Sequence, residues 1–405
     1  MESTWFLAAL WLGLALLASL LAIWFRISTA LTEIVVGTVA APGLSVGFGL
    51  EALGSDAPWI GFLAGTGAIV LTFLAGAELD PATFRAKWKE AFWVGLVGFL
   101  APFLCCTALA YYGLGWSAPS SWLAGVALST TSVAVVYAVL LELGLNQTSF
   151  GKSILAACFV NDLGTVLALG LIFSPFTWKS LTFIGAAVAV LTALPGLTRR
   201  LFLRYGARPS ELEAKYLLML LFGLGGLAVW SGSEAVLPAY VIGMVLAGTV
   251  GNDHALVRRL RTLTFGLLTP FYFLRAGSLV SIPALVAAPL VFLALLLVKM
   301  ASKLAGLFPA VAAFRYAGKE RVYYTLMMST GLTFGTISAL FGLSHGIIDG
   351  AQYSFLVAAV IGSAVVPTMI ANVWFLPRHL LPARRTSKPP GSTAAPAAAD
   401  AAPLE

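Results

Sequence analysis

Long apolar segments recur along this chain of 405 residues and constrain its fold more than any other feature. Runs of about 20 residues with few charges follow one another as far as residue 377, and an α-helix of that length spans the hydrocarbon core of a bilayer. Only 10% of the residues are charged, against about 25% in soluble domains. The chain is therefore predicted to be an all-α polytopic membrane protein without a soluble catalytic domain between its spans.

The apolar runs predict about thirteen transmembrane helices. They lie near residues 3–25, 29–50, 58–78, 91–112, 120–143, 152–173, 180–197, 212–232, 236–250, 262–276, 282–314, 321–344 and 352–377. The first run follows Glu2, precedes Arg26 and has no small-residue cleavage site, so we expect a retained helix rather than a signal peptide. The three cysteines lie inside spans and form neither a disulfide framework nor a metal-ligand pattern.

Lys and Arg residues are distributed unequally between alternate connections of the predicted spans. Connections from odd-numbered to even-numbered spans, together with the C-terminal segment, contain nearly all of them, and the opposite connections contain only Lys179. Because positively charged loops stay in the cytoplasm, the N-terminus is predicted outside and the C-terminus inside, in a bacterial-type inner membrane. Arg275, Lys299 and Lys303 are exceptions that lie within spans.

Asp162 is predicted at the centre of the sixth span. It lies ten residues after Lys152 and eleven before Phe173, which at about 1.5 Å per residue is about 15 Å from either membrane face. An ionisable group at that depth indicates a functional site, and a structural carboxylate satisfied by a neighbouring helix is the alternative. Other acids lie at span ends, and Glu33 lies one turn inside the second span, near enough to its end to reach water.

Two lysines of the eleventh span provide a counter-charge. Lys299 and Lys303 lie one helical turn apart on one face. Counting from Arg315 places Lys303 about 18 Å deep, which matches Asp162, and Lys299 about 24 Å deep. Extension of the side chain to an interface is the alternative, and it suits Lys299 better than Lys303.

Small polar residues interrupt two spans at matching depth. The segment 129–132 interrupts the fifth span and 329–336 interrupts the twelfth. Hydroxyl groups and glycines satisfy an unwound backbone within a membrane, although close helix packing is the alternative. Because the two spans are seven apart, spans 4–6 and 11–13 are predicted to form inverted repeats, with the two broken helices crossing beside Asp162.

Five motifs resemble the monovalent cation:proton antiporter superfamily, in the transmembrane domain of its sodium/hydrogen exchanger-like, NapA- and Kef-type members. They are FVND at 159–162, ALSTTSVA at 127–134, TEIVVG at 32–37, LAGAELDP at 74–81 and FYFLRAG at 271–277. The resemblance covers roughly residues 28–377, and the motifs occur in the family's order.

The resemblance implies a core that carries the ion and moves against a dimerisation scaffold, and hence a homodimer. The expected parts are the scaffold spans 1–3 in 1–90, core repeat 1 in 91–173, linker and scaffold spans 7–10 in 174–280, core repeat 2 in 281–377, and a cytoplasmic tail in 378–405. The tail is rich in Pro, Ala, Ser and Thr and is predicted to be disordered.

The resemblance also assigns site residues. Asp162 matches the family's ion- and proton-binding aspartate, and Thr131 matches the unwound-helix position that offers oxygen atoms. Lys303 matches the core lysine or arginine, expected either to hydrogen-bond Asn161 and brace the crossing or to release a proton when the cation binds. The full candidate set for binding the ion and proton is Asp162, Asn161, Thr131, Thr130 and Ser132, with Lys303 in support and Lys299, Thr333, Glu78 and Arg275 as secondary candidates.

The expected function is secondary antiport of a monovalent cation, Na⁺ before K⁺ or Li⁺, against H⁺, with a role in pH homeostasis. A buried carboxylate is stable when protonated or cation-bound, so competition for Asp162 gives obligatory exchange. Asn161 replaces a second acidic group, which favours electroneutral 1:1 exchange, although related Asn-Asp members usually pair it with arginine rather than lysine. LTF at 332–334 replaces the GEF of potassium-efflux relatives.

Other classes fit less well. An ion channel needs a continuous pore, a sodium-coupled organic-anion symporter needs a polar aqueous cavity, and an intramembrane enzyme needs a catalytic set that the spans do not contain. No phosphate-binding loop or nucleotide-binding domain is recognisable. We therefore expect a transporter rather than an enzyme, without cofactors or nucleic-acid partners, whose partners are the ions, the lipid bilayer and a second copy.

Overall fold

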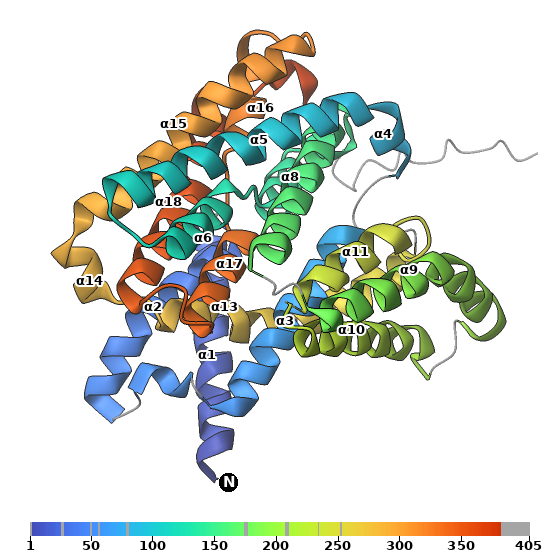
Figure 1. Cartoon of the computed structure of the whole chain (residues 1–405), viewed down its shortest axis with the longest axis horizontal. Helices are drawn as coiled ribbons and strands as arrows, with labels where there is room; N and C mark the ends of the chain where they lie inside the picture. The colour runs from blue at the N-terminus through green and yellow to red at the C-terminus, as the bar shows by residue number, and fades with distance from the viewer. Residues whose placement is uncertain are drawn as a thin grey trace, which may run out of the picture.

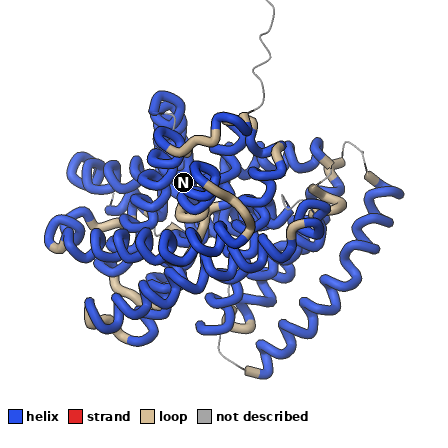
Figure 2. The backbone as a smooth tube through the Cα atoms, turned by 90° about the horizontal axis from the view of Figure 1, so that it is seen from above, coloured by secondary structure: helices blue, strands red, loops and turns tan. Residues whose placement is uncertain are grey.

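The computed structural model describes residues 2–25, 28–48, 51–55, 57–77, 81–173, 177–206, 210–233, 235–251 and 253–381. Over these ranges the chain forms helices joined by short loops, with no strand (Figure 2). The α-helices are α1 (Glu2–Phe25), α2 (Thr29–Phe48), α3 (Pro58–Ala77), α4 (Pro81–Ala86), α5 (Trp88–Ala108), α6 (Ala118–Ser129), α7 (Val133–Glu142), α8 (Ser149–Phe173), α9 (Trp178–Tyr205), α10 (Leu212–Trp230), α11 (Val236–Leu246), α12 (His254–Leu263), α13 (Thr269–Ser278), α14 (Ile282–Ala287), α15 (Pro289–Ala313), α16 (Gly318–Met327), α17 (Thr333–Ser344) and α18 (Gly350–Trp374). Short helical turns are η1 (Glu51–Gly54), η2 (Leu109–Gly113), η3 (Leu145–Gln147), η4 (Thr264–Leu268) and η5 (Arg378–Leu380).

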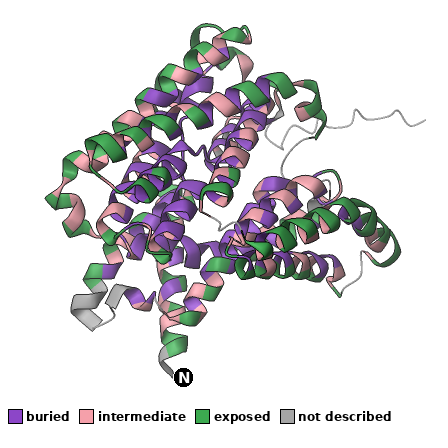
Figure 3. Cartoon of the chain, viewed as in Figure 1, coloured by how far each residue is buried: buried purple, intermediate pink, exposed green. Residues whose placement is uncertain are grey.

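The helices fall where the sequence predicts membrane spans. Eight of them, among the described residues, are long and apolar enough to cross a bilayer alone. Shorter apolar helices include α11 and α17. The outward faces of α1, α9 and α15 expose large apolar side chains such as Trp5, Leu181 and Leu297, whereas buried residues concentrate where the helices cross (Figure 3). Exposed apolar faces around a buried interior are what a lipid environment favours.

Two sets of three consecutive spans have the same pattern, in which the middle helix is broken. One set is α5, the pair α6 and α7, and α8, and the other is α15, the pair α16 and α17, and α18. Helix α5 packs against α6, α8 and α15, and α17 packs against α6 and α18, so the two sets form one bundle (Figure 1). The prediction of two broken helices is confirmed. The second break is shorter than predicted, since the helix resumes at Thr333 and residues 333–336 are helical.

The remaining helices pack through reciprocal glycine contacts. Helix α3 lies against α11, and α2 lies against α13. A Cβ atom on Gly76 would meet the carbonyl oxygen of Tyr240, and one on Gly243 would meet the carbonyl oxygen of Phe73. The α2–α13 pair has the same reciprocal contacts between its backbones. Such close approach of helices through small residues is typical of membrane interfaces.

Two predicted spans differ in their bounds from the structure. The segment 282–314 is not one helix, because Ala288 has φ −137° and ψ 61° and separates α14 from α15. Pro289 lacks an N–H group and excludes the helical conformation from the residue before it. The predicted span 262–276 begins earlier, at His254, because the carboxylate of Asp253 caps the helix at the N–H of Leu256, 3.0 Å away. Helix α12 then continues through η4 into α13.

Charged and polar residues gather at one end of the bundle, named here the basic face. The ammonium group of Lys87 donates to the hydroxyl groups of Ser153 and Tyr316, and the Tyr316 hydroxyl group donates to Glu90 over 3.0 Å. These bonds join α5 and α8 to the loop after α15. Elsewhere, Arg261 of α12 stacks over Tyr137 of α7, 5.8 Å from the ring centroid. Burial raises the pKa of the Tyr316 phenol, so it stays a hydrogen-bond donor at physiological pH.

Candidate functional site

The two breaks meet inside the bundle. The backbone N–H of Ser132 donates to the carbonyl oxygen of Thr330 over 3.1 Å. The Thr131 hydroxyl group donates to the carbonyl oxygen of Met328 over 2.7 Å, and the hydroxyl groups of Ser132 and Thr333 lie 3.2 Å apart. Because an unwound backbone leaves donors and acceptors without helical partners, each broken helix satisfies part of the other. The crossing predicted from the hydroxyl-rich segments is therefore present.

Lys303 of α15 binds both breaks at once. Its ammonium group donates to the carbonyl oxygen of Thr130 over 2.9 Å, to the hydroxyl group of Thr131 over 2.7 Å and to the carbonyl oxygen of Met328 over 2.9 Å. The side chain is fully buried. These three bonds match the three donors of an ammonium group. Lys303 therefore joins the two breaks directly, and these three hydrogen bonds do not include Asn161, the partner expected from the sequence.

Asn161 and Asp162 approach the crossing from α8. The amide oxygen of Asn161 accepts a hydrogen bond from the backbone N–H of Thr131 over 2.8 Å. Asp162 is 1% exposed, and its carboxylate interacts with the backbone N–H of Val133, the first residue of α7. Its Oδ1 atom has no hydrogen-bond partner among the described residues. An unpaired oxygen on a buried carboxylate is costly, which indicates a place for a proton or a cation.

The dipoles of the helix ends at the crossing are complementary to the charges of Lys303 and Asp162. Lys303 lies at the C-terminal ends of α6 and α16, where the helix dipole is negative, and Asp162 lies at the N-terminal end of α7, where it is positive. Each charged side chain therefore faces helix ends of opposite sign. This arrangement favours a positive charge at Lys303 and a negative charge at Asp162.

Lys299 also lies at the crossing. Its side chain is fully buried, so the alternative of extension to an interface is wrong for this residue. A Cβ atom on Gly331, in the second break, would collide with the ammonium group of Lys299. That group has no hydrogen-bond partner among the described residues. Only a glycine at position 331 leaves room for it.

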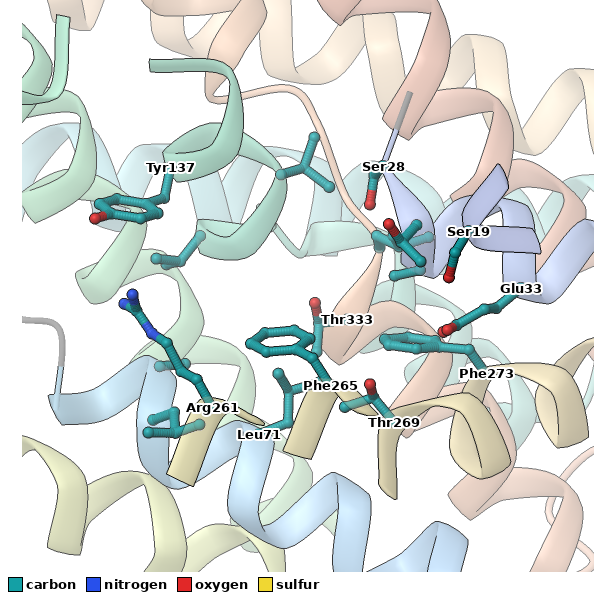
Figure 4. A pocket seen from close by; sticks show the side chains of 17 residues that line it. Ser19, Ser28, Glu33, Leu71, Tyr137, Arg261, Phe265, Thr269, Phe273 and Thr333 are labelled. Atoms are coloured by element: carbon teal, nitrogen blue, oxygen red, sulfur yellow. The ribbon is translucent and has the colours of Figure 1, made fainter. Parts of the chain in front are cut away.

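A cavity of about 550 Å³ lies beside the crossing, with Arg261 and Tyr137 on one wall and Glu33 on the opposite wall (Figure 4). Its inner wall is formed by Val133, Leu332 and Thr333, the residues that follow the two breaks. Its outer part is lined by residues of α1, α2, α3, α7 and α12 to α13, among them Glu33 and Arg261. Asp162 itself does not line the cavity. Val133 lines the cavity, and its backbone N–H contacts the Asp162 carboxylate, so the cavity approaches the acid without including it.

One secondary candidate, Arg275, lies away from the crossing. The Arg275 guanidinium group donates from Nε to the carbonyl oxygen of Ser55 over 2.9 Å and so joins α13 to η1. It is not among the residues that contact the crossing. Glu78 lies outside the described residues, as does the predicted tail beyond residue 381.

Sequence reasoning did not single out Tyr240 of α11. Its hydroxyl group donates to the carbonyl oxygen of Phe159 in α8 over 3.0 Å, one turn before Asp162, and its ring meets Phe334 of α17 edge to face. The sequence feature that could have identified Tyr240 is that it is a single tyrosine within a short apolar helix. Glu33, expected one turn inside its span and near enough to the end to reach water, is 2% exposed and lies in the cavity wall.

Comparison with known proteins adds three findings. The sodium/hydrogen exchanger transmembrane family matches residues 12–376. A protein of Methanocaldococcus jannaschii named probable Na⁺/H⁺ antiporter 3 is 26% identical over 368 residues, which cover 86% of this chain and 91% of that protein. The glutathione-regulated potassium-efflux protein KefC of Escherichia coli K12 is 26% identical over 346 residues, covering 82% of this chain. This chain spans about half the length of KefC, 54%.

Solved structures show the same fold. The sodium proton antiporter MjNhaP1 from Methanocaldococcus jannaschii at pH 8 superposes with a TM-score of 0.70, over 92% of this chain and 96% of that one, at 16% identity. A second structure of MjNhaP1 gives a TM-score of 0.69 at 18% identity. The predicted fold class, with its crossed broken helices, is thereby confirmed.

Proposed function

The chain belongs to the sodium/hydrogen exchanger transmembrane family, and from that premise we propose that it exchanges a monovalent cation for a proton at Asp162 by alternating access. The observation that carries this proposal is the Asp162 carboxylate, buried at the N-terminus of α7 with its Oδ1 atom unpartnered. Asp162 and the Ser132 hydroxyl oxygen are the ligands it offers a cation, beside Thr131, Thr130 and Met328, whose oxygen atoms bind Lys303. Among the described residues, no group of three or more His, Cys, Asp or Glu comes together, and oxygen ligands around one carboxylate suit a monovalent cation.

Competition between the proton and the cation for the Asp162 carboxylate couples the transport of one to the transport of the other. When Asp162 is protonated, its charge is absent, and when it binds a cation, its charge is balanced. Both states avoid a bare carboxylate in a medium of low dielectric constant. A core that moves only in these two states exchanges one cation for one proton, and the exchange is electroneutral.

Asn161 and Lys303 position the backbone of the two breaks, and neither carries the exchanged proton. Asn161 accepts from Thr131, and Lys303 donates to three oxygen atoms of the two breaks. Three acceptors favour the charged ammonium group. This supports the bracing role of Lys303 over proton release.

The moving part is assigned to the two helix sets with broken middles, α5–α8 and α15–α18. The glycine-packed helices α2, α3, α11 and α13, with α1, α9 and α10, form the scaffold and the homodimer contact. The distribution of positive loops supports a cytoplasmic location for the loop that contains Arg258 and Arg259, and we assign the cavity, which the neighbouring Arg261 lines, an opening to the cytoplasm. In a bacterial-type inner membrane this exchange regulates internal pH.

Sodium is the proposed cation, because the relative from Methanocaldococcus jannaschii carries a sodium/proton name and covers most of both chains. Potassium is the second candidate, because the KefC relatives named for potassium efflux match with equal identity.

The test is collapse of an imposed pH gradient in proteoliposomes on addition of Na⁺, K⁺ or Li⁺. Wild type responds to at least one cation, and Asp162→Asn responds to none while it elutes as the same monodisperse species. A wild type that responds to no monovalent cation overturns the proposal and favours another substrate, such as an organic anion.

A further inference from the structure

Glu33 places a second carboxylate in the cavity. The residue is 2% exposed, and its side chain extends from α2 into the cavity beside Phe273 (Figure 4). Ser19 and Thr333 line the same cavity (Figure 4). Within the described part of the chain, no hydrogen bond or ion pair involves the Glu33 carboxylate.

The charged and titratable groups around the cavity leave Glu33 unpaired. Arg261 and Tyr137 line the opposite wall, where the guanidinium group stacks over the phenol ring at 5.8 Å from its centroid. The other polar lining comes from hydroxyl groups, those of Ser19, Ser28, Thr29, Thr269 and Thr333. The Ser19 hydroxyl group donates to the carbonyl oxygen of Ala15 over 2.9 Å, so its lone pairs remain to accept a cation.

A carboxylate held out of water without a partner is unstable unless it binds a proton or a cation. Glu33 lines a cavity whose other polar lining includes several hydroxyl groups, and carboxylate and hydroxyl oxygens are the chemistry of a cation site. Resting on the proposed function, we propose that Glu33 forms a second binding site for the transported cation, which the ion occupies before it reaches Asp162. The inner wall at Val133 and Thr333 separates the two sites.

Equilibrium binding separates the two sites directly. The probe is whichever of Na⁺, K⁺ or Li⁺ drives exchange in wild type, added to purified protein and followed by isothermal titration calorimetry. Asp162→Asn is expected to retain one binding event, and the double variant Asp162→Asn with Glu33→Gln to retain none. Loss of all binding in Asp162→Asn alone overturns the second site.

Transport kinetics provide the second test. Glu33→Gln is expected to raise the apparent KM for the cation by about tenfold, which corresponds to about 1.4 kcal/mol, with the maximal rate nearly unchanged because Asp162 is intact. Glu33→Asp keeps the charge and is expected to give an intermediate KM, and it serves if Glu33→Gln does not fold. The matched control is Glu320→Gln, a carboxylate of the basic face that pairs with His379 at 2.7 Å and lies outside the cavity lining.

The two proposals fail separately. If wild type exchanges the cation for protons but Glu33→Gln keeps the wild-type KM, only the second site is overturned. If wild type drives no exchange with any of the three cations, the proposed function fails as well. A fall in maximal rate at unchanged KM in both Glu33 variants assigns Glu33 to the conformational change and also overturns the site.

Discussion

The ammonium group of Lys303 lies 2.9 Å from the carbonyl oxygen of Met328, at the C-terminal end of α16. The same group donates to Thr130 at the C-terminal end of α6. One side chain thus satisfies the ends of two half-helices that belong to different repeats. The crossing is held by this lysine as much as by contacts between the breaks.

Replacement of Lys303 is expected to destabilise the bundle. Lys303→Met keeps the length of the side chain but removes the ammonium donor from the carbonyl oxygens of Thr130 and Met328, of which, among the described residues, only that of Met328 keeps a donor, the Thr131 hydroxyl group. Each lost charged hydrogen bond costs about 1.5–3 kcal/mol. The apparent Tm in detergent should fall by several degrees. The control Lys319→Met alters an exposed lysine at the start of α16 and should leave the Tm unchanged. An equal Tm for both variants contradicts the bracing role.

Gly331→Ala is expected to disturb the crossing more than an ordinary helix glycine. Its Cβ atom would meet the Lys299 ammonium group and would lie 2.9 Å from the carbonyl oxygen of Thr130. Overpacking of this kind costs about 1–3 kcal/mol, so both the Tm and the exchange rate should fall. Gly61→Ala, where nothing lies within 4 Å of the new atom, is the control. Similar behaviour of the two variants shows that the site near Lys299 is more open than the contacts indicate.

Asn161→Asp is expected to make transport electrogenic. An aspartate oxygen still accepts from the N–H of Thr131, as Asn161 does at 2.8 Å, and the variant adds a second acid beside Asp162. A second titratable group allows two protons to move per cation. Currents on a solid-supported membrane should appear in the variant and be absent in wild type. A current from wild type contradicts the one-proton cycle.

Proton competition sets the sign of the pH dependence. Protons and the cation share Asp162, so a lower pH on the side of the cation raises the apparent KM, and a higher pH lowers it. For one competing proton the limiting change is about tenfold per pH unit. Initial rates at several cation concentrations and pH values give the slope. A slope twice as steep indicates two protons, and a KM independent of pH excludes competition at one carboxylate.

The sequence predicted the breaks and the central acid because both have a clear pattern. Hydroxyl residues in the middle of an apolar span are unusual, and Asp162 is equally distant from two marked ends of its helix. The break at Ala288 escaped prediction because Pro289 stands in an uninterrupted apolar run, where hydropathy alone reads one long helix.

The sequence predicted which residues form the site better than it predicted which atoms they contact. The main acceptors of Lys303 are backbone carbonyl groups, which every residue has, so no sequence pattern distinguishes Met328 from its neighbours. The sequence favoured Asn161 as the partner because it is a polar side chain at the right depth. Glu33 could not be placed in the cavity either, because the cavity walls come from helices far apart in the chain.

The hydrogen bonds of Lys303 to acceptors in both repeats also have a consequence for the order in which the helices insert into the membrane during synthesis. Helix α15 enters the membrane with two lysines, each costing about 2.5–3.5 kcal/mol at the centre of an isolated helix. By then α6 has been synthesised, so the carbonyl group of Thr130 is present, whereas Met328 follows later in the chain. Insertion of α15 is therefore expected to rely on the earlier repeat as a template, and the lysine becomes fully satisfied only after α16 has followed it into the bilayer.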